Sequence, residues 1–201
     1  MTDPAPRRPP RLDALAWPAL CLLLGLASAV LWFARGAGAL AWHPGSWKSE
    51  PWVLWTASLG HLSGAHLLAN LVAALVLGVL GAFLRARPSA VLALLLAWPL
   101  GTLALLWWPQ VSAYSGMSGL LNAMVAVLWA HSVLGTGSKA TSFLILGAVL
   151  LKLLGERAWS QPIAFDPNWG FNVVYAAHLS GAVCGAVSGV SLIWPPRKRL
   201  A

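Results

Sequence analysis

A serine and a histidine in two separate apolar segments are the residues of this chain best suited to chemistry. Ser118 stands between Gly116 and Gly119 at the start of one segment, and His178 lies near the start of another. A serine hydroxyl beside an imidazole can act as the nucleophile of acyl transfer, because the imidazole takes up the hydroxyl proton. The pattern Gly-x-Ser-Gly alone is weak evidence, since glycines in apolar helices also serve close packing.

A second polar pair, His66 and Asn70, lies in a third apolar segment. The two residues are four positions apart, so they share one face of a helix. Each supplies a hydrogen-bond donor of the kind that stabilises the oxyanion formed during acyl transfer. A role in helix packing is the alternative for this pair and also for His178. The chemistry needs no cofactor and no metal, and we expect neither.

The acidic residues do not complete a catalytic triad in this prediction. All of them lie in tails or in the flanks of apolar segments: Asp3, Asp13, Glu50, Glu156 and Asp166. We therefore predict a dyad of Ser118 and His178, with the oxyanion held by His66, Asn70 and the backbone N–H of Ser118. Asn122 lies one turn after Ser118 and faces the same way, so it either orients the His178 ring or satisfies a neighbouring helix.

The composition places these residues in a membrane. The chain is 59% apolar and 9% charged, whereas a soluble domain is about a quarter charged. The net charge of +8 does not indicate nucleic-acid binding, because basic clusters flank the apolar segments at both ends, as is typical of cytoplasmic membrane flanks. These clusters are Arg7, Arg8, Arg11, Arg197, Lys198 and Arg199. We expect contact with membrane lipid and none with nucleic acid.

Charge-free intervals predict an all-α membrane protein with six transmembrane helices. The predicted spans are residues 12–33, 63–84, 89–108, 117–135, 137–154 and 172–194, with an outer loop over 34–60. The fifth span is short and depends on Lys139 and Lys152 reaching opposite interfaces. The positive-inside rule then puts the N- and C-termini in the cytoplasm, and removing the fifth span would break that rule. We predict one membrane domain over residues 1–201.

The even-numbered spans all run from outside to inside in this topology. His66, Asn70, Ser118 and His178 each lie within about three turns of a span's start, so they are expected at one level in the outer part of the bilayer. Two stripes of small residues, which let helices approach closely, support contact between the fourth and sixth spans. The stripes are Gly119, Ala123, Ala126 and Ala130 on the fourth, and Gly181, Gly185 and Gly189 on the sixth.

The joint pattern resembles the rhomboid family of intramembrane serine proteases over the whole six-helix core. The matching motifs are His61-x4-His66-x3-Asn70, Gly116-x-Ser118-Gly119 and Ala177-His178-x2-Gly181-x3-Gly185. The resemblance implies a six-helix rhomboid-like bundle with Ser118 as nucleophile and His178 as base. It also implies that His66 and Asn70 are oxyanion donors and that His61 supports the outer end of the second helix.

Within that family, the compact size and the stretch over residues 51–56, Pro-Trp-Val-Leu-Trp-Thr, are most similar to the rhombosortase branch. This resemblance implies an enzyme of the bacterial inner (cytoplasmic) membrane that cleaves transmembrane proteins with C-terminal sorting tails. The chain departs from the family in two places. Val53 follows Trp52 where many rhomboids have arginine, and Asn122 stands where many have a tyrosine under the catalytic histidine.

Two other functions compete with proteolysis. The first is a non-catalytic rhomboid-like protein that binds client helices, although such relatives usually lack the serine or the histidine. The second is a small transporter, which would need polar residues across the full depth of the membrane. Here the polar cluster is confined to one leaflet, which favours the protease.

Overall fold

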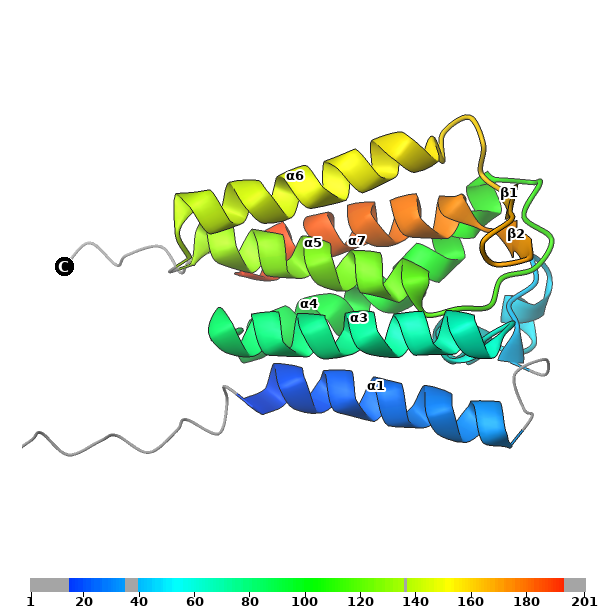
Figure 1. Cartoon of the computed structure of the whole chain (residues 1–201), viewed down its shortest axis with the longest axis horizontal. Coiled ribbons are helices and arrows are strands. Elements are labelled where there is room, and N and C mark those ends of the chain that lie inside the picture. The colour runs from blue at the N-terminus through cyan, green and yellow to red at the C-terminus, as the bar shows by residue number, and fades with distance from the viewer. Residues whose placement is uncertain (1–14, 35–39, 136, 194–201) are drawn as a thin grey trace, which may run out of the picture.

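The computed structural model describes residues 15–34, 40–135 and 137–193. Six long helices run side by side in this part of the chain (Figure 1). They are α1 (Ala16–Phe33), α3 (Gly64–Phe83), α4 (Pro88–Leu103), α5 (Ser118–Leu134), α6 (Lys139–Glu156) and α7 (Tyr175–Ile193). Each predicted span therefore coincides with one long helix to within a few residues, although α4 begins one residue before its span and α6 ends two residues after its span. The basic clusters at the two chain ends lie outside the described residues.

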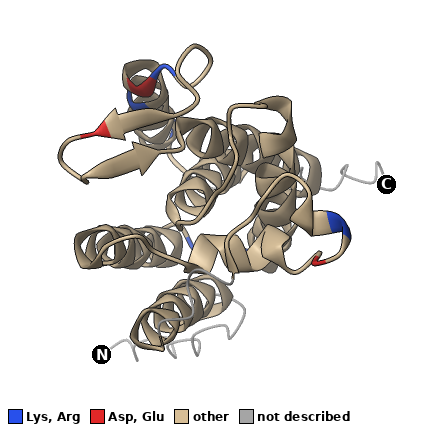
Figure 2. Ribbon diagram, turned by 90° about the vertical axis from the view of Figure 1, so that its right-hand side faces the viewer, with Lys and Arg blue, Asp and Glu red and all other residues tan. Residues whose placement is uncertain are grey.

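Four helical stretches among the described residues are long and apolar enough to cross a membrane. They are α1, α3, α7 and the stretch Pro88–Trp107, in which the 3₁₀ turn η5 (Ala104–Trp107) continues α4. Helix α5 is apolar but shorter. Seen from the end that carries the hairpin, few positions of the described ribbon are charged (Figure 2). The chain is thus a multi-pass membrane protein, while crossing by α5 and α6 stays a prediction.

Short elements gather at one end of the bundle. The outer loop contains η3 (Ser46–Lys48), α2 (Val53–Thr56) and η4 (Ala57–Leu59). Between α6 and α7, strands β1 (Ala164–Asp166) and β2 (Phe171–Val173) form an antiparallel hairpin. Helix α7 begins at Tyr175, later than the predicted start at residue 172, because residues 171–173 pair with β1 before the chain enters the helix.

Helix α5 is the central helix of the bundle, and α7 packs closely against it. Most residues of α5 are buried. A Cβ atom added to Gly181 would collide with the carbonyl oxygen of Gly119, and one added to Gly185 would collide with the carbonyl oxygen of Ala123. The two backbones therefore touch along the small-residue stripes. This contact fixes the start of α5 next to the start of α7.

Replacing Gly185 with alanine is expected to destabilise the fold. The new methyl group would lie 2.8 Å from the Ala123 Cα atom and against its carbonyl oxygen. Because overpacking of a tight contact costs about 1–3 kcal/mol, we expect a lower melting temperature in detergent. Gly147→Ala is the matched control, since no atom lies within 4 Å of its added Cβ. Equal melting temperatures for the two variants would contradict this account of the contact.

Candidate active site

Ser118 is the first residue of α5, and the loop before it is shaped by glycine. Gly116 has a φ of +140°, a conformation that favours glycine. Its N–H donates to the Ala57 carbonyl oxygen at 3.0 Å. A Cβ atom here would also lie 2.8 Å from Cε1 of His66. Gly116 therefore lets the loop pass close to the His66 ring and leaves Ser118 half-buried at the helix start.

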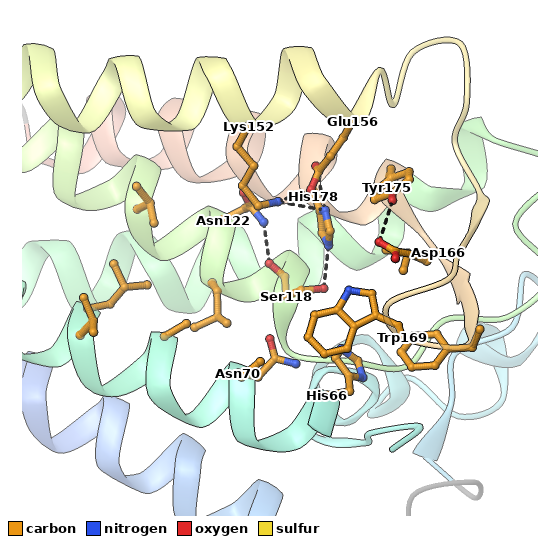
Figure 3. Close-up of a pocket in the computed structure, with 18 residues that line it drawn as sticks. His66, Asn70, Ser118, Asn122, Lys152, Glu156, Asp166, Trp169, Tyr175 and His178 are labelled. Carbon is orange, nitrogen blue, oxygen red and sulfur yellow. Dashed lines mark hydrogen bonds and ion pairs between the residues drawn. The ribbon is translucent and has the colours of Figure 1, made fainter. Parts of the chain in front are cut away.

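His178 lies in the first turn of α7 and faces Ser118 (Figure 3). Its Nε2 atom is 2.8 Å from the Ser118 Oγ atom, which is hydrogen-bond distance. The side chain of His178 is only 7% exposed. The close approach of α5 and α7 thus brings a serine hydroxyl and an imidazole together, as acyl transfer requires.

A carboxylate completes this arrangement, so the prediction that no acidic residue lies near the dyad was wrong. Oε2 of Glu156 is 2.9 Å from Nδ1 of His178. Lys152 sits beside both, with its Nζ atom 2.6 Å from Oε1 of Glu156 and 3.1 Å from the same His178 Nδ1 atom. The structure therefore places Ser118, His178 and Glu156 in one line, each within hydrogen-bond distance of the next.

The carboxylate was missed because Glu156 lies beyond the predicted fifth span, which ended at residue 154. Helix α6 continues to Glu156 and brings this residue to the level of His178. The sequence does carry a signal, since Lys152 and Glu156 are four residues apart and such pairs face each other on a helix. Lys152, which was expected to reach the membrane interface, contacts Glu156 and His178.

His66 and Asn70 lie on α3 and face the same cavity as Ser118. The Ser63 side chain caps α3 by accepting a hydrogen bond from the His66 N–H at 3.1 Å, which places His66 in the first turn. Nδ2 of Asn70 and Nδ1 of His66 are buried and have no hydrogen-bond partner among the described residues. Buried polar atoms normally have partners, so this side of the cavity offers a bound group the Asn70 amide donor, and also the His66 ring when its Nδ1 carries the proton.

The cavity has a volume of about 570 Å³ and differs in polarity between its ends. Ser118, His178, His66 and Asn70 line it together with Glu156 and Lys152. Apolar side chains of α3 and α5 line the part that lies farther along these helices from the hairpin end: Ala73, Val76, Leu77, Leu121 and Val125. The structure therefore brings the predicted nucleophile, base and oxyanion donors to one site with an apolar wall.

Asn122 lines the cavity but makes no hydrogen bond to His178. Its Nδ2 atom donates to the Ser118 carbonyl oxygen at 2.8 Å, one turn earlier on the same helix. The position that it was predicted to fill beside His178 is occupied by Glu156. Neither alternative for Asn122 therefore holds, because its bond is made within α5.

His61 lies next to His66 and outside the cavity lining. It is buried, its Nδ1 atom is 3.1 Å from the Leu59 carbonyl oxygen, and its ring meets the His66 ring edge-on with centroids 5.0 Å apart. Burial lowers the pKa of His61 below its usual value, which favours the neutral ring at pH 7. A neutral His61 ring with Nδ1 protonated donates to the Leu59 carbonyl oxygen, and the same ring packs against His66 on the side of the preceding loop.

The hairpin supplies further cavity residues that the sequence did not predict. The ring of Trp169 lies 5.8 Å from the His66 ring, measured between centroids (Figure 3). The ring of Phe171 lies 5.2 Å from the His66 ring by the same measure. Tyr175 donates to Oδ2 of Asp166 at 3.4 Å at the same end. No local pattern marks this hairpin as part of a site, because its position depends on how α6 and α7 pack.

The sequence model of the family described as Rhomboid domain matches residues 48–195. This range covers about three quarters of the chain and includes every cavity residue named above. No curated protein matches the chain.

Proposed function

Because the chain belongs to the rhomboid family of intramembrane serine proteases, we propose that it hydrolyses a peptide bond in or beside a membrane-spanning segment of other proteins. The observation that carries the proposal is the 2.8 Å contact between Ser118 Oγ and His178 Nε2 in a cavity with an apolar wall. The buried, unpartnered Asn70 amide and His66 ring nitrogen on α3 support it as well.

The acylation step uses Ser118 and His178 in their expected roles. Ser118 Oγ attacks the scissile carbonyl carbon, and His178 Nε2 takes the hydroxyl proton. The tetrahedral intermediate then collapses, the C–N bond breaks, and the departing amine receives that proton from His178. The products of this step are the free amine fragment and an ester on Ser118.

The deacylation step repeats the same chemistry with water. A water molecule gives a proton to His178 Nε2 and attacks the ester carbonyl carbon. Ser118 Oγ leaves and takes the proton back, which releases the carboxylic acid fragment. Water must therefore reach the cavity, and the hairpin end of the bundle, where the polar cavity residues lie, is where we place its entry.

The oxyanion of both tetrahedral intermediates is assigned to three donors. These are the Asn70 amide, the His66 ring and the backbone N–H of Ser118, which at the first position of a helix has no intrahelical partner. Donors already fixed by the fold stabilise the developing charge without rearranging during the reaction.

Replacing Asn70 with alanine is expected to lower the cleavage rate by about 10²-fold, the usual effect of losing one oxyanion donor. Binding of the substrate should change little, because the amide acts mainly on the charge of the transition state. Asn168→Ala is the control, since Asn168 is exposed in the hairpin and is not a cavity residue. A rate for Asn70→Ala within twofold of the wild-type rate would remove Asn70 from the oxyanion site.

We further propose that all six long helices span the membrane and that both termini are cytoplasmic. The expected membrane is the bacterial inner membrane, and the expected substrates carry a C-terminal sorting tail, as in the rhombosortase branch. These finer proposals rest on the sequence resemblance and on the basic residues that flank the apolar segments. The apolar wall of the cavity suits a substrate segment that leaves the lipid.

The experiment that tests the proposed function is cleavage of a reporter in proteoliposomes. The reporter has a soluble domain followed by the sorting tail expected for the rhombosortase branch, which consists of a Gly-Gly-type motif, one transmembrane helix and a basic end. Matched reporters lack either the helix or the motif. We expect the wild-type chain to cut only reporters with the helix, and to prefer the one with the motif. A folded protein that cuts no transmembrane reporter would contradict the proposal.

A further inference from the structure

His178 has two neighbours of opposite charge at a single ring atom. Nδ1 lies 2.9 Å from the Glu156 carboxylate and 3.1 Å from the Lys152 ammonium (Figure 3). In a neutral imidazole only one ring nitrogen carries a proton. Nδ1 therefore either donates to Glu156 or accepts from Lys152, and the two cases correspond to different tautomers of the ring.

The choice of tautomer decides whether His178 can act as a base. If Nδ1 is protonated and donates to Glu156, Nε2 is free to accept the Ser118 hydroxyl proton. If Nδ1 accepts from Lys152, Nε2 carries the proton and can only donate to Ser118 Oγ, which leaves the serine without a base. The carboxylate thus favours the productive tautomer, and the ammonium favours the unproductive one.

The geometry of the ion pair favours the productive tautomer. Lys152 Nζ is nearer to Glu156 Oε1, at 2.6 Å, than to His178 Nδ1. Oε1 of Glu156 therefore binds the Lys152 ammonium, and Oε2 of Glu156 stays free to accept from Nδ1 of His178. The Glu156 side chain is 17% exposed while that of Lys152 is 44% exposed, so the carboxylate is the more enclosed of the two groups.

We propose that Glu156 is a positioning residue for His178, so that this chain works with a Ser118–His178–Glu156 triad in which Lys152 holds the carboxylate. This inference rests on the proposed function and deepens it. The three members come from the start of α5, the start of α7 and the end of α6. During acylation the proton moves only between Ser118 and His178, and Glu156 stabilises the imidazolium without taking the proton.

The test measures labelling of the detergent-solubilised chain by a fluorophosphonate, with the maximal rate and the half-saturating probe concentration determined separately. In a serine protease triad, changing the carboxylate to its amide lowers kcat by about 10⁴-fold because the wrong tautomer forms. Since Glu156 is partly exposed, we expect Glu156→Gln to lower the maximal rate by about 10²-fold or more, with little change in half-saturation. Glu156→Asp should recover part of the rate.

Two controls separate positioning from a general effect on the fold. Glu50→Gln removes the same charge from an exposed loop residue and should leave labelling unchanged. Melting temperatures of the Glu156 variants show whether Glu156 acts only by stabilising the contact between α6 and α7. A Glu156→Gln variant that labels within twofold of wild type, or that loses rate only in proportion to lost folded protein, would overturn the inference.

A spectroscopic readout decides the inference even if the wild type takes up no probe. In ¹⁵N-histidine NMR of the full chain, with His178 assigned by its loss in His178→Asn, we expect wild-type Nδ1 to be protonated and Nε2 to be bare. Glu156→Gln should shift His178 toward the other tautomer. An unchanged tautomer would refute the role of Glu156, whereas absent labelling with the expected tautomer would count against the proposed function alone.

Discussion

We expect the change of Ser118 to alanine to abolish both cleavage of a transmembrane reporter and labelling by a fluorophosphonate. The Oγ atom of Ser118 is the hydroxyl placed 2.8 Å from His178 Nε2, so its loss removes the nucleophile and the group that the probe would modify. Loss of a serine nucleophile lowers kcat by about 10⁶-fold in a well-studied protease. A residual activity of that size would be too low to detect in either assay. Reporter cleavage and in-gel fluorescence measure the two effects.

Ser115→Ala is the control for this variant. Ser115 lies three residues earlier in the same loop and is also half-buried, but it does not line the main cavity. We expect it to keep most of the activity. Because the only side-chain hydrogen bond of Ser118 Oγ among the described residues is the one to His178, Ser118→Ala should fold normally. Substantial cleavage by a folded Ser118→Ala protein would refute the assigned nucleophile.

Replacing His178 is expected to have an effect of the same size. Without Nε2 the Ser118 hydroxyl keeps its proton, and a neutral serine hydroxyl is a weak nucleophile. We expect His178→Ala and His178→Asn to lose cleavage and labelling by about 10⁶-fold, since nucleophile and base act as a unit. The double variant Ser118→Ala, His178→Ala should therefore be no worse than either single one.

The stability of these variants needs its own measurement, because His178 is buried and also contacts Glu156 and Lys152. His178→Asn keeps a polar side chain at this position and is the safer variant for folding. His43→Ala is the control, since His43 is exposed in the outer loop. A His178→Asn protein that melts like wild type and still labels at a similar rate would exclude His178 as the base.

The sequence predicts much of the site because helix direction and residue spacing are local properties. Residues near the starts of three helices that run the same way lie at one level, and this reasoning placed His66, Ser118 and His178 together. The glycine stripe on the last helix likewise predicted close packing against the stripe that begins at Gly119, and the two backbones touch there. Both conclusions need only periodicity and the apolar pattern.

The remaining features depend on packing between distant segments. Glu156 reaches His178 only because α6 runs two residues past the expected span and ends beside the start of α7. Trp169 and Phe171 reach His66 only through the hairpin that joins those helices. Acidic and aromatic residues in a polar flank look the same in a sequence whether they face solvent or a site.

The position of α6 depends on its packing against α5 and on polar contacts with α7, and neither can be read from the sequence. The helix carries Lys152 and Glu156 near its end, and it packs mainly against α5 and less against α7. Its polar end is therefore held to α7 by the contacts at His178 rather than by a broad apolar interface. The same contacts that complete the site thus also fix the end of this helix.

The measurement that tests the central claim most directly is mass-spectrometric mapping of the fluorophosphonate adduct on the wild-type chain. The account predicts a single adduct on Ser118, formed at an appreciable rate only when His178 is present. An adduct on another serine, such as Ser115 or Ser180, or no adduct on a preparation that cleaves a transmembrane reporter, would contradict it.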